Sequence, residues 1–273
     1  MILDELFKKN LAQSQKESLS YISLFSSAGV GCYGFKKENF NCIATVEILS
    51  KRIKVQQYNK KCKYASGYIT GDINNKEIQD RIYSEIDLWK SKESLKCVDV
   101  IIATPPCQGM SVANHKKNNE ILRNSLILKS IQLVESIQPR FFVFENVKNF
   151  LTTTCTNFDN KEMSINEAID GSLEKDFNIL KKVINFKEYG SNSSRTRTLV
   201  IGVRKDIKDI TPYDLFPDKE NSRTLRQFVG HYKELTQMGE ILDDDIYHHF
   251  RKYNIKMLPW IKSTKEGFSA FNN

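Results

Sequence analysis

A cysteine with a constrained backbone is the strongest candidate for chemistry in this sequence. Cys107 follows the apolar run at residues 98–103, with Pro105 and Pro106 before it and Gly109 soon after it. The carboxyl end of a buried strand is where open α/β sheets bind their ligands. A thiolate is a strong nucleophile, and nearby positive charge favours its formation. The position therefore predicts a nucleophilic cysteine rather than a packed thiol.

Two other apolar runs carry, at one end, charged and polar residues that could assist this thiol. Glu145 and Asn146 end the run that starts after Arg140, and Arg195 and Arg197 stand two apart before another run. Parallel strands end at one edge of a sheet, so we expect Glu145 near the cysteine. Residues two apart in a strand share a face, so both arginines can point the same way. A surface hairpin carrying ordinary charges is the alternative.

A glycine cluster after the first apolar run indicates a nucleotide site. Gly29, Gly31 and Gly34 match the G-x-G-x-x-G pattern of dinucleotide-binding turns, and Glu47 ends the next apolar run. A carboxylate there can bind ribose hydroxyls. Nicotinamide dinucleotides and S-adenosylmethionine (AdoMet) both carry such a ribose, so these residues do not choose between them. A tight strand-to-helix turn without a ligand also fits.

Alternating strand and helix patterns would position these residues. Short apolar runs predict strands at residues 21–25, 42–47, 98–103 and 141–144, and amphipathic stretches predict helices at 51–58, 76–92 and 125–137. This alternation is typical of a parallel sheet with helices on both faces. Farther on, we expect a loop at 152–160, a helix near 173–182, and strands at 183–186 and 198–203. The turn-rich residues 190–197 between those strands predict a closing antiparallel hairpin.

Composition narrows the class of protein. With 40% hydrophobic, 11% aromatic and 27% charged residues in 273, the chain is not disordered, collagen-like or membrane-spanning. The charged N-terminus lacks the apolar stretch of a secretion signal, which favours the cytoplasm. Six cysteines without a Cys-x-x-Cys pair indicate neither a metal site nor disulfides. A net charge of +8 suits a polyanion such as nucleic acid, although solubility alone would also explain it.

Taken together, these segments closely resemble the DNA (cytosine-5) methyltransferase family. Its motifs occur here in the family's order: the loop 25–29, Glu47, Gly71-Asp72-Ile73, Pro105-Pro106-Cys107-Gln108, Arg123-Asn124-Ser125-Leu126, Glu145-Asn146-Val147 and Arg195-x-Arg197. The resemblance covers residues 20–205 and continues more weakly through 223–226 and 259–270. It implies a Rossmann-like AdoMet-dependent methyltransferase fold and a role in a restriction-modification system.

The resemblance also assigns roles to residues. AdoMet would be bound by Phe25, Ser26, Ser27, Ala28, Gly29, Glu47, Ile48, Asp72, Ile73 and Pro105. Cys107 would add to C6 of a cytosine flipped out of double-stranded DNA, and Glu145 would contact N3 and the exocyclic amine. Asn146 would hold the backbone before the cysteine, while Arg195 and Arg197 would act at the O2 carbonyl.

The chain also departs from the family pattern. Ser27 replaces the usual first glycine of the loop, and Ser193 replaces a glutamine before the arginines. The target-recognition domain and the closing glycine-rich motif have no counterpart here. We therefore expect an N-terminal extension at 1–19, a catalytic domain at 20–205, a segment at 206–273, and a second polypeptide that supplies recognition.

Three other functions fit parts of the sequence. An AdoMet-binding but inactive module fits the absent motifs, and RNA methylation would use the same chemistry. An NAD-dependent oxidoreductase would fit the glycine cluster, but it leaves the cysteine, glutamate and arginine motifs unexplained.

Overall fold

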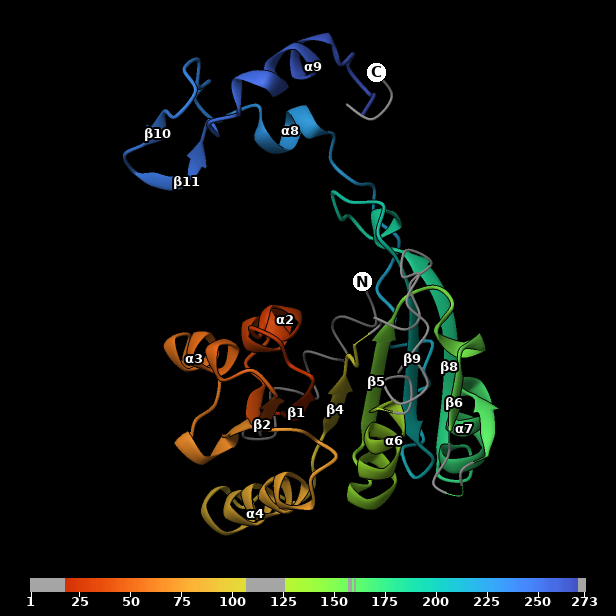
Figure 1. Ribbon diagram of the computed structural model, residues 1–273. Coiled ribbons are helices and arrows are strands. Elements are labelled where there is room, and N and C mark those ends of the chain that lie inside the picture. Colours follow the sequence, from red (N-terminus) through yellow and green to blue (C-terminus); the bar gives the residue numbers. More distant parts are fainter. Residues whose placement is uncertain (1–17, 107–125, 157–158, 160, 270–273) are drawn as a thin grey trace. The chain divides into compact units, whose positions relative to one another are not determined.

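The computed structural model describes residues 18–106, 126–156, 159 and 161–269 (Figure 1). The chain divides into two units, residues 1–222 and 223–273. Among the described residues, no helix has the length and apolar character needed to cross a membrane. The predicted division into 1–19, 20–205 and 206–273 stays a prediction.

A seven-stranded sheet organises the first unit. Its strands lie in the order β3-β2-β1-β4-β5-β9-β8. Five are parallel: β1 (Ser20–Leu24), β2 (Asn41–Glu47), β3 (Tyr68–Thr70), β4 (Val100–Ala103) and β5 (Phe141–Asn146). The chain runs outward from β1 to β3 and then returns to β4 on the other side of β1. This reversal between β1 and β4 is the switch point at which α/β sheets bind ligands.

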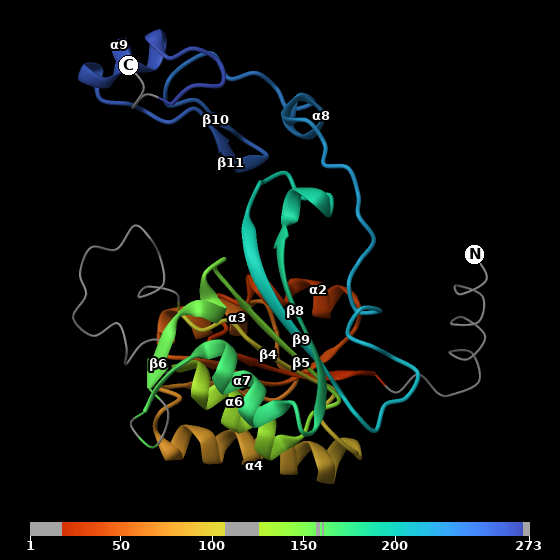
Figure 2. The ribbon, with the colours of Figure 1, turned by 90° about the vertical axis from the view of Figure 1, so that its right-hand side faces the viewer.

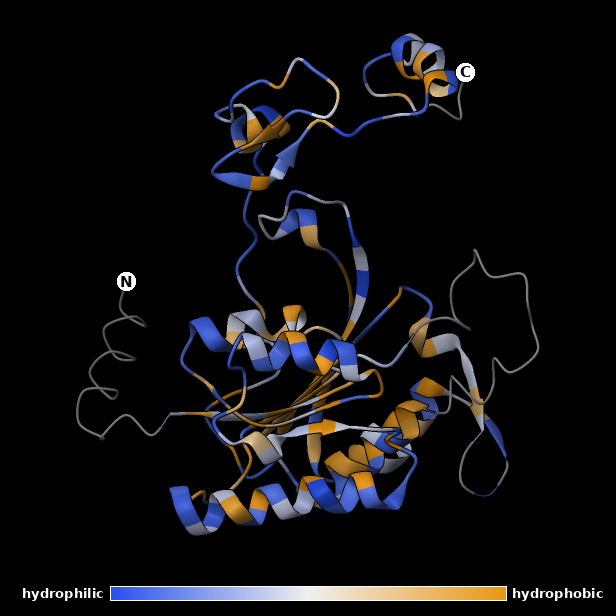
Figure 3. Ribbon diagram, turned by 60° about the vertical axis from the view of Figure 1, so that its left-hand side comes forward, coloured by the Kyte–Doolittle hydropathy of each residue, from blue (hydrophilic) through white to orange (hydrophobic). Residues whose placement is uncertain are grey.

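Helices cover both faces of this sheet, as the alternating pattern predicts. Figure 2 shows α2 (Tyr33–Lys37) and α3 (Ser50–Tyr58) on one face, with α4 (Lys76–Glu93), α6 (Leu126–Ile137) and α7 (Ile165–Leu173) on the other. Apolar strand residues lie between the helical layers (Figure 3). Helix α4 illustrates the fit, because Ile78, Ile82, Ile86 and Trp89 recur on one side and are all buried.

The closing hairpin is present, but its first strand is longer than predicted. Strands β8 (Phe177–Asn185) and β9 (Thr196–Arg204) pair antiparallel along their whole length, and β9 pairs antiparallel with β5. The predicted helix near 173–182 is therefore wrong. Helix α7 begins at a capping box between Ser164 and Glu167 and has ended by Leu173. Phe177 then packs edge-on against Phe142 beneath the sheet.

The remaining elements are short. The predicted loop at 152–160 contains β6 (Thr154–Thr156), which pairs with β7 (Glu162–Ser164). Single 3-10 turns lie at Val30–Cys32, Ala65–Gly67, Phe150–Thr152, Phe186–Glu188 and Ile255–Met257. The second unit holds α8 (Leu225–Val229), the hairpin of β10 (Ile241–Leu242) and β11 (Asp245–His249), and α9 (Leu258–Ser263). None of its described residues is fully buried.

Candidate active site

A cavity of about 780 Å³ opens where β1, β2, β4 and β5 end. This volume lies within the range of small-molecule sites. Most of the predicted site residues line it together: Phe25, Ser27, Glu47, Ile48, Asp72, Ile73, Pro105, Glu145, Asn146, Arg195 and Arg197. Ser26, Ala28 and Gly29 belong to the same loop as Phe25 but are not among the lining residues. The structure thus brings residues from six segments of the sequence to one place.

The loop at residues 25–29 has an unusual backbone. Phe25, Ser27 and Gly29 have φ angles of 55°, 50° and 88°, in the left-handed region that L-residues seldom adopt. The Ser26 amide donates to the Val46 carbonyl at 3.0 Å, and the Thr104 hydroxyl donates to the Phe25 carbonyl at 3.2 Å. A left-handed conformation at position 27 gives a physical reason for the glycine that resembling sequences carry there.

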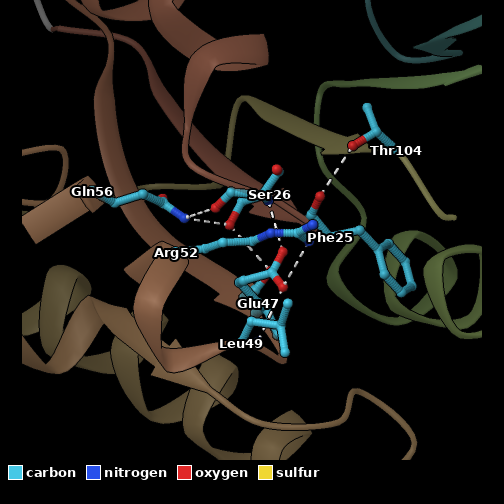
Figure 4. A network of polar contacts seen from close by, with 9 residues as sticks. Phe25, Ser26, Glu47, Leu49, Arg52, Gln56 and Thr104 are labelled. Atoms are coloured by element: carbon cyan, nitrogen blue, oxygen red, sulfur yellow. Dashed lines mark hydrogen bonds and ion pairs between the residues drawn. The ribbon is translucent and has the colours of Figure 1, made fainter. Parts of the chain in front are cut away.

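Glu47 is the buried carboxylate of the cavity wall. Its Oε2 accepts from the Ser27 amide at 2.8 Å, and its Oε1 accepts from the Leu49 amide at 3.1 Å and from Arg52 at 3.3 Å (Figure 4). A carboxylate offers about four acceptor positions, and these three bonds leave one. The Arg52 contact is the longest of the three, and the Arg52 side chain is 45% exposed. A bound ligand can therefore displace Arg52 from Glu47. Glu47 therefore fits a partner that donates hydroxyl hydrogen bonds, such as a ribose.

The second carboxylate of this edge follows β3. The Gly71 amide donates to the Glu47 carbonyl at 3.1 Å, which places Asp72 beside the end of β2. One Asp72 oxygen accepts from the Asn74 amide at 2.9 Å, and the side chain is half-buried. Two carboxylates on neighbouring strand ends suit an adenosine, which presents several donors to one wall of a cavity.

An ion pair lies at the other side of the cavity. The Arg197 Nε atom is 2.9 Å from Glu145 Oε1, and Arg195 Nη2 is 4.0 Å from the same oxygen. Strand β9 runs antiparallel to β5, so its first residues lie beside the last residues of β5. Arg197 is 17% exposed, whereas Arg195 is 55% exposed. The pair presents a carboxylate and guanidinium groups to the same space, a set that can bind both donors and acceptors of a planar base.

Asn146 links two strand ends beneath this pair. Its side-chain amide donates to the Pro105 carbonyl at 3.0 Å, and its Oδ1 accepts from the Val147 amide at 2.8 Å. The side chain is buried. Asn146 thus fixes the backbone two residues before Cys107. Cys107 itself lies outside the described residues, as do 108–125, and its predicted role stays a prediction.

Three side chains at this site were not predicted from the sequence. Thr104 and Arg52 contact the loop and Glu47 as described above, and Gln56 of α3 contacts Ser26 and Ser27. Gln56 alone carried a usable signal, because it follows Ile53 by three positions and so lies on the buried side of its helix. A buried glutamine needs hydrogen-bond partners.

The fold and cavity define an α/β protein of the Rossmann-like type. Residues 19–269 match the C-5 cytosine-specific DNA methylase family, and the chain belongs to that family. This confirms the resemblance seen in the sequence. The described residues contain no cluster of three or more histidine, cysteine or acidic side chains able to hold a metal ion.

Individual known proteins also resemble this chain over most of its length. The type II methyltransferase M1.HgaI of Avibacterium volantium is 29% identical over 94% of this chain, and M1.HphI of Haemophilus parahaemolyticus is 28% identical over 92%. The chain spans 68% and 62% of the lengths of these two relatives. A solved DNA modification methyltransferase from an E. coli prophage matches 89% of this chain and 64% of its own, with a TM-score of 0.60 and 24% identity. This last likeness confirms the fold.

Proposed function

We propose that this chain methylates C5 of cytosine in double-stranded DNA as part of a type II restriction-modification system. Its family acts on cytosine in DNA, and its named relatives are type II methyltransferases. The observation that carries the proposal is the joint placement of Glu47 and the Glu145–Arg197 pair in one cavity. The first suits the methyl donor and the second suits the base.

AdoMet, when bound, supplies an electrophilic methyl group. The loop at residues 25–29, Glu47 and Asp72 would hold its adenosine and amino-acid portions. C5 of cytosine is a weak nucleophile, so the Cys107 thiolate adds to C6 and the C5–C6 π electrons become available at C5. C5 then takes the methyl group, loses its proton, and expels Cys107 as the C5–C6 double bond re-forms. The cytosine must leave the base stack for this to occur.

Glu145 and Arg197 would stabilise the ring during this addition. Negative charge moves toward N3 and O2 of the base when sulfur adds, and groups already in place to meet it lower the barrier. Arg197 can donate to O2, and Glu145 can bridge N3 and the exocyclic amine when it carries a proton for N3. Their 2.9 Å contact holds both side chains ready in the absence of a base.

Trapping with 5-fluorocytosine tests the nucleophile. Fluorine at C5 cannot leave as a proton does, so DNA carrying this base should form a lasting adduct with Cys107. The substitution Cys107→Ser should abolish both the adduct and methyl transfer, while Cys97→Ser serves as the matched control because Cys97 is only partly buried. An adduct mapped to Cys32 or Cys155 would overturn the assignment. Firm AdoMet binding with neither adduct nor transfer, even at DNA concentrations high enough to saturate weak binding, would identify an inactive module instead.

Calorimetry tests the methyl donor. Hydrogen bonds to a charged group contribute about 1.5–3 kcal/mol, so Glu47→Ala should weaken AdoMet binding by roughly 10- to 150-fold. Glu77→Ala, at an exposed position of α4, should leave the affinity unchanged. Tight binding of NAD without binding of AdoMet would refute the proposal.

We further propose that a second polypeptide supplies target recognition. Specific protein–DNA interfaces bury roughly 1,000–2,500 Å² and read base edges from an element set in a groove. Among the described residues after Val203, only Pro212 is buried. The net charge of +8 can hold phosphates, but phosphate contacts do not specify sequence. The 273-residue chain should therefore bind duplex DNA weakly, with a steep dependence on salt. Rapid methylation of one defined sequence by this chain alone would show the inference to be wrong.

A further inference from the structure

Gln56 is a buried polar residue whose side-chain amide makes three hydrogen bonds, all to the proposed AdoMet loop and its support. It lies on α3 and is 1% exposed. Its Nε2 donates to the Ser27 carbonyl at 2.6 Å and to the Ser26 hydroxyl at 2.8 Å, and Figure 4 shows the side chain reaching from the helix to the loop. Its Oε1 accepts from the Thr45 hydroxyl at 2.7 Å. These three hydrogen bonds hold the Gln56 side chain in one orientation.

The orientation of the amide follows from its partners. The Ser27 carbonyl can only accept a hydrogen bond, so the atom facing it must be a donor. Thr45 in turn accepts from Lys61 Nζ at 3.0 Å, and the Ser26 hydroxyl donates to the Val46 carbonyl at 3.2 Å. The bonds thus run in one direction, from Lys61 through Thr45 and Gln56 to the loop. Each bond in such a chain polarises the next and strengthens it.

The loop needs this support because its backbone is strained. Phe25 and Ser27 are non-glycine residues with positive φ angles, a conformation that persists only where the surroundings impose it. Gln56 acts on the carbonyl of Ser27 itself. It also packs against Gly29, where an added Cβ would lie 3.1 Å from Gln56 Cγ. The glutamine therefore fixes both the strained residue and the turn that follows it.

We propose that Gln56 is a positioning residue that holds residues 25–29 in the conformation required to bind AdoMet. The inference rests on the proposed function, since it assigns this loop to AdoMet. Ser27 also donates to Glu47 Oε2, so a shift of the loop would displace the carboxylate that meets the ribose. Without the glutamine, the loop would leave the binding conformation part of the time. The measured affinity would then equal the intrinsic affinity multiplied by the fraction of molecules in which the loop is correctly placed.

Three substitutions on one helix separate this role from general stability. Gln56→Leu keeps the volume and removes the amide. Gln57→Leu places the same side chain at the neighbouring exposed position. Ile53→Val removes a methylene group from the buried side of α3 and tests the effect of lost stability alone. Each is measured by calorimetry with S-adenosylhomocysteine, the demethylated form of the donor, and by thermal unfolding without ligand.

We expect Gln56→Leu to raise the dissociation constant about tenfold or more, which is the change that one lost hydrogen bond of about 1.4 kcal/mol would produce. Gln57→Leu should match the wild type in both measurements. Ile53→Val should unfold at a lower temperature and still bind with unchanged affinity. If Ile53→Val weakens binding as much as Gln56→Leu does, Gln56 has no specific role. An unchanged affinity in Gln56→Leu also overturns the proposal.

Gln56→Glu adds a pH readout. At neutral pH a carboxylate oxygen would face the Ser27 carbonyl and repel it, whereas the protonated acid could donate to it. The affinity of Gln56→Glu, divided by that of the wild type at the same pH, should therefore recover on acidification. Division by the wild-type value at each pH cancels changes common to both proteins, and the other ionisable groups near Gln56 are Glu47, Arg52, Lys61 and Tyr68. A ratio that does not change with pH would contradict the proposal.

The wild type and Glu47→Ala separate the two hypotheses. If the wild type does not bind the ligand, the proposed function and the role of Gln56 both fail. If the wild type binds, Glu47→Ala weakens binding, and Gln56→Leu does not, only the role of Gln56 fails.

Discussion

The substitution Asn146→Asp tests how the two strand ends of the site are joined. The change keeps the size of the side chain and the oxygen that accepts from the Val147 amide. It removes the Nδ2 donor, which is 3.0 Å from the Pro105 carbonyl. Asn146 and Pro105 are both buried at the wall of the cavity, so little water can reach that carbonyl to replace the bond. An unpaired buried carbonyl costs roughly 1–3 kcal/mol.

We therefore expect Asn146→Asp to lose about 2 kcal/mol of unfolding free energy. A domain of this size loses roughly 2–4 °C of Tm for each kcal/mol, so the Tm should fall by about 4–8 °C. Asn149→Asp is the matched control, since Asn149 is exposed in the connection that follows β5 and its side chain makes no cap bond. The same substitution there should change the Tm by less than about 1 °C.

The loss of unfolding free energy in Asn146→Asp should depend on pH. The protonated aspartic acid can donate to Pro105, so the fold favours this form and raises the pKa of the introduced carboxyl above its unfolded value. The stability of the variant is then greatest below the unfolded pKa and is lost as the pH rises through the folded pKa. Its difference from the wild type should be largest at neutral pH and shrink toward pH 4.

Function supplies a second measurement on the same variant. Pro105 lies two residues before Cys107, so a released backbone should slow adduct formation with 5-fluorocytosine DNA by about tenfold or more. The affinity for S-adenosylhomocysteine should fall by less, because Pro105 is one of several residues expected to bind the donor. Equal stability of Asn146→Asp and Asn149→Asp would refute the reasoning. So would a loss of donor affinity as large as the loss of adduct formation.

Two further predictions concern the framework of the first unit. Gly202→Ala should destabilise by about 2–4 kcal/mol in urea unfolding, because the new Cβ would lie 2.0 Å from the Phe142 ring; Gly171→Ala, within α7 and with no atom within 4 Å, should stabilise by about 0.5–1 kcal/mol. The Ser164 amide and hydroxyl hold the pKa of Glu167 below its ordinary value, so Ser164→Ala should raise that pKa in an NMR titration. The stability that this contact provides is present above the unfolded pKa and is lost as the pH falls through the folded pKa. An unchanged Glu167 titration in Ser164→Ala would show that the Ser164 hydroxyl does not bond to this carboxylate.

Local patterns in the sequence predicted four of the five parallel strands, and β3 was not predicted. Each predicted strand overlaps an observed one, because strands buried on both faces must be continuously apolar. Strand β8 was predicted only from residue 183, and its first six residues were predicted as helix because they carry no such signal. Lys181 and Lys182 are partly exposed at the edge of the sheet, and only their pairing with β9 makes this segment a strand. Edge strands depend on a partner distant in the sequence, which a local pattern does not contain.

The same distinction applies to the site. Glu47 and Glu145 were predicted because each ends an apolar strand, and strand ends meet at one edge of a parallel sheet. Thr104 and Gln56 were not predicted, because they bond to backbone atoms of the loop at residues 25–29. Only folding brings those atoms close to the two side chains. Hydrogen bonds from a side chain to a distant carbonyl leave no periodic trace in the sequence. The residues that line the cavity are thus more predictable than those that hold its walls in place.

The replacement of glycine by Ser27 shows why these supporting residues matter. From the sequence alone, serine is small enough to keep this loop, but the sequence does not show what holds its backbone. The structure keeps the left-handed backbone at Ser27 and ties it on both sides, through its amide to Glu47 and through its carbonyl to Gln56. Each bond offsets part of the cost that a side chain imposes at positive φ. A departure from the motif at one residue is therefore compatible with a binding loop when a buried neighbour fixes the same conformation.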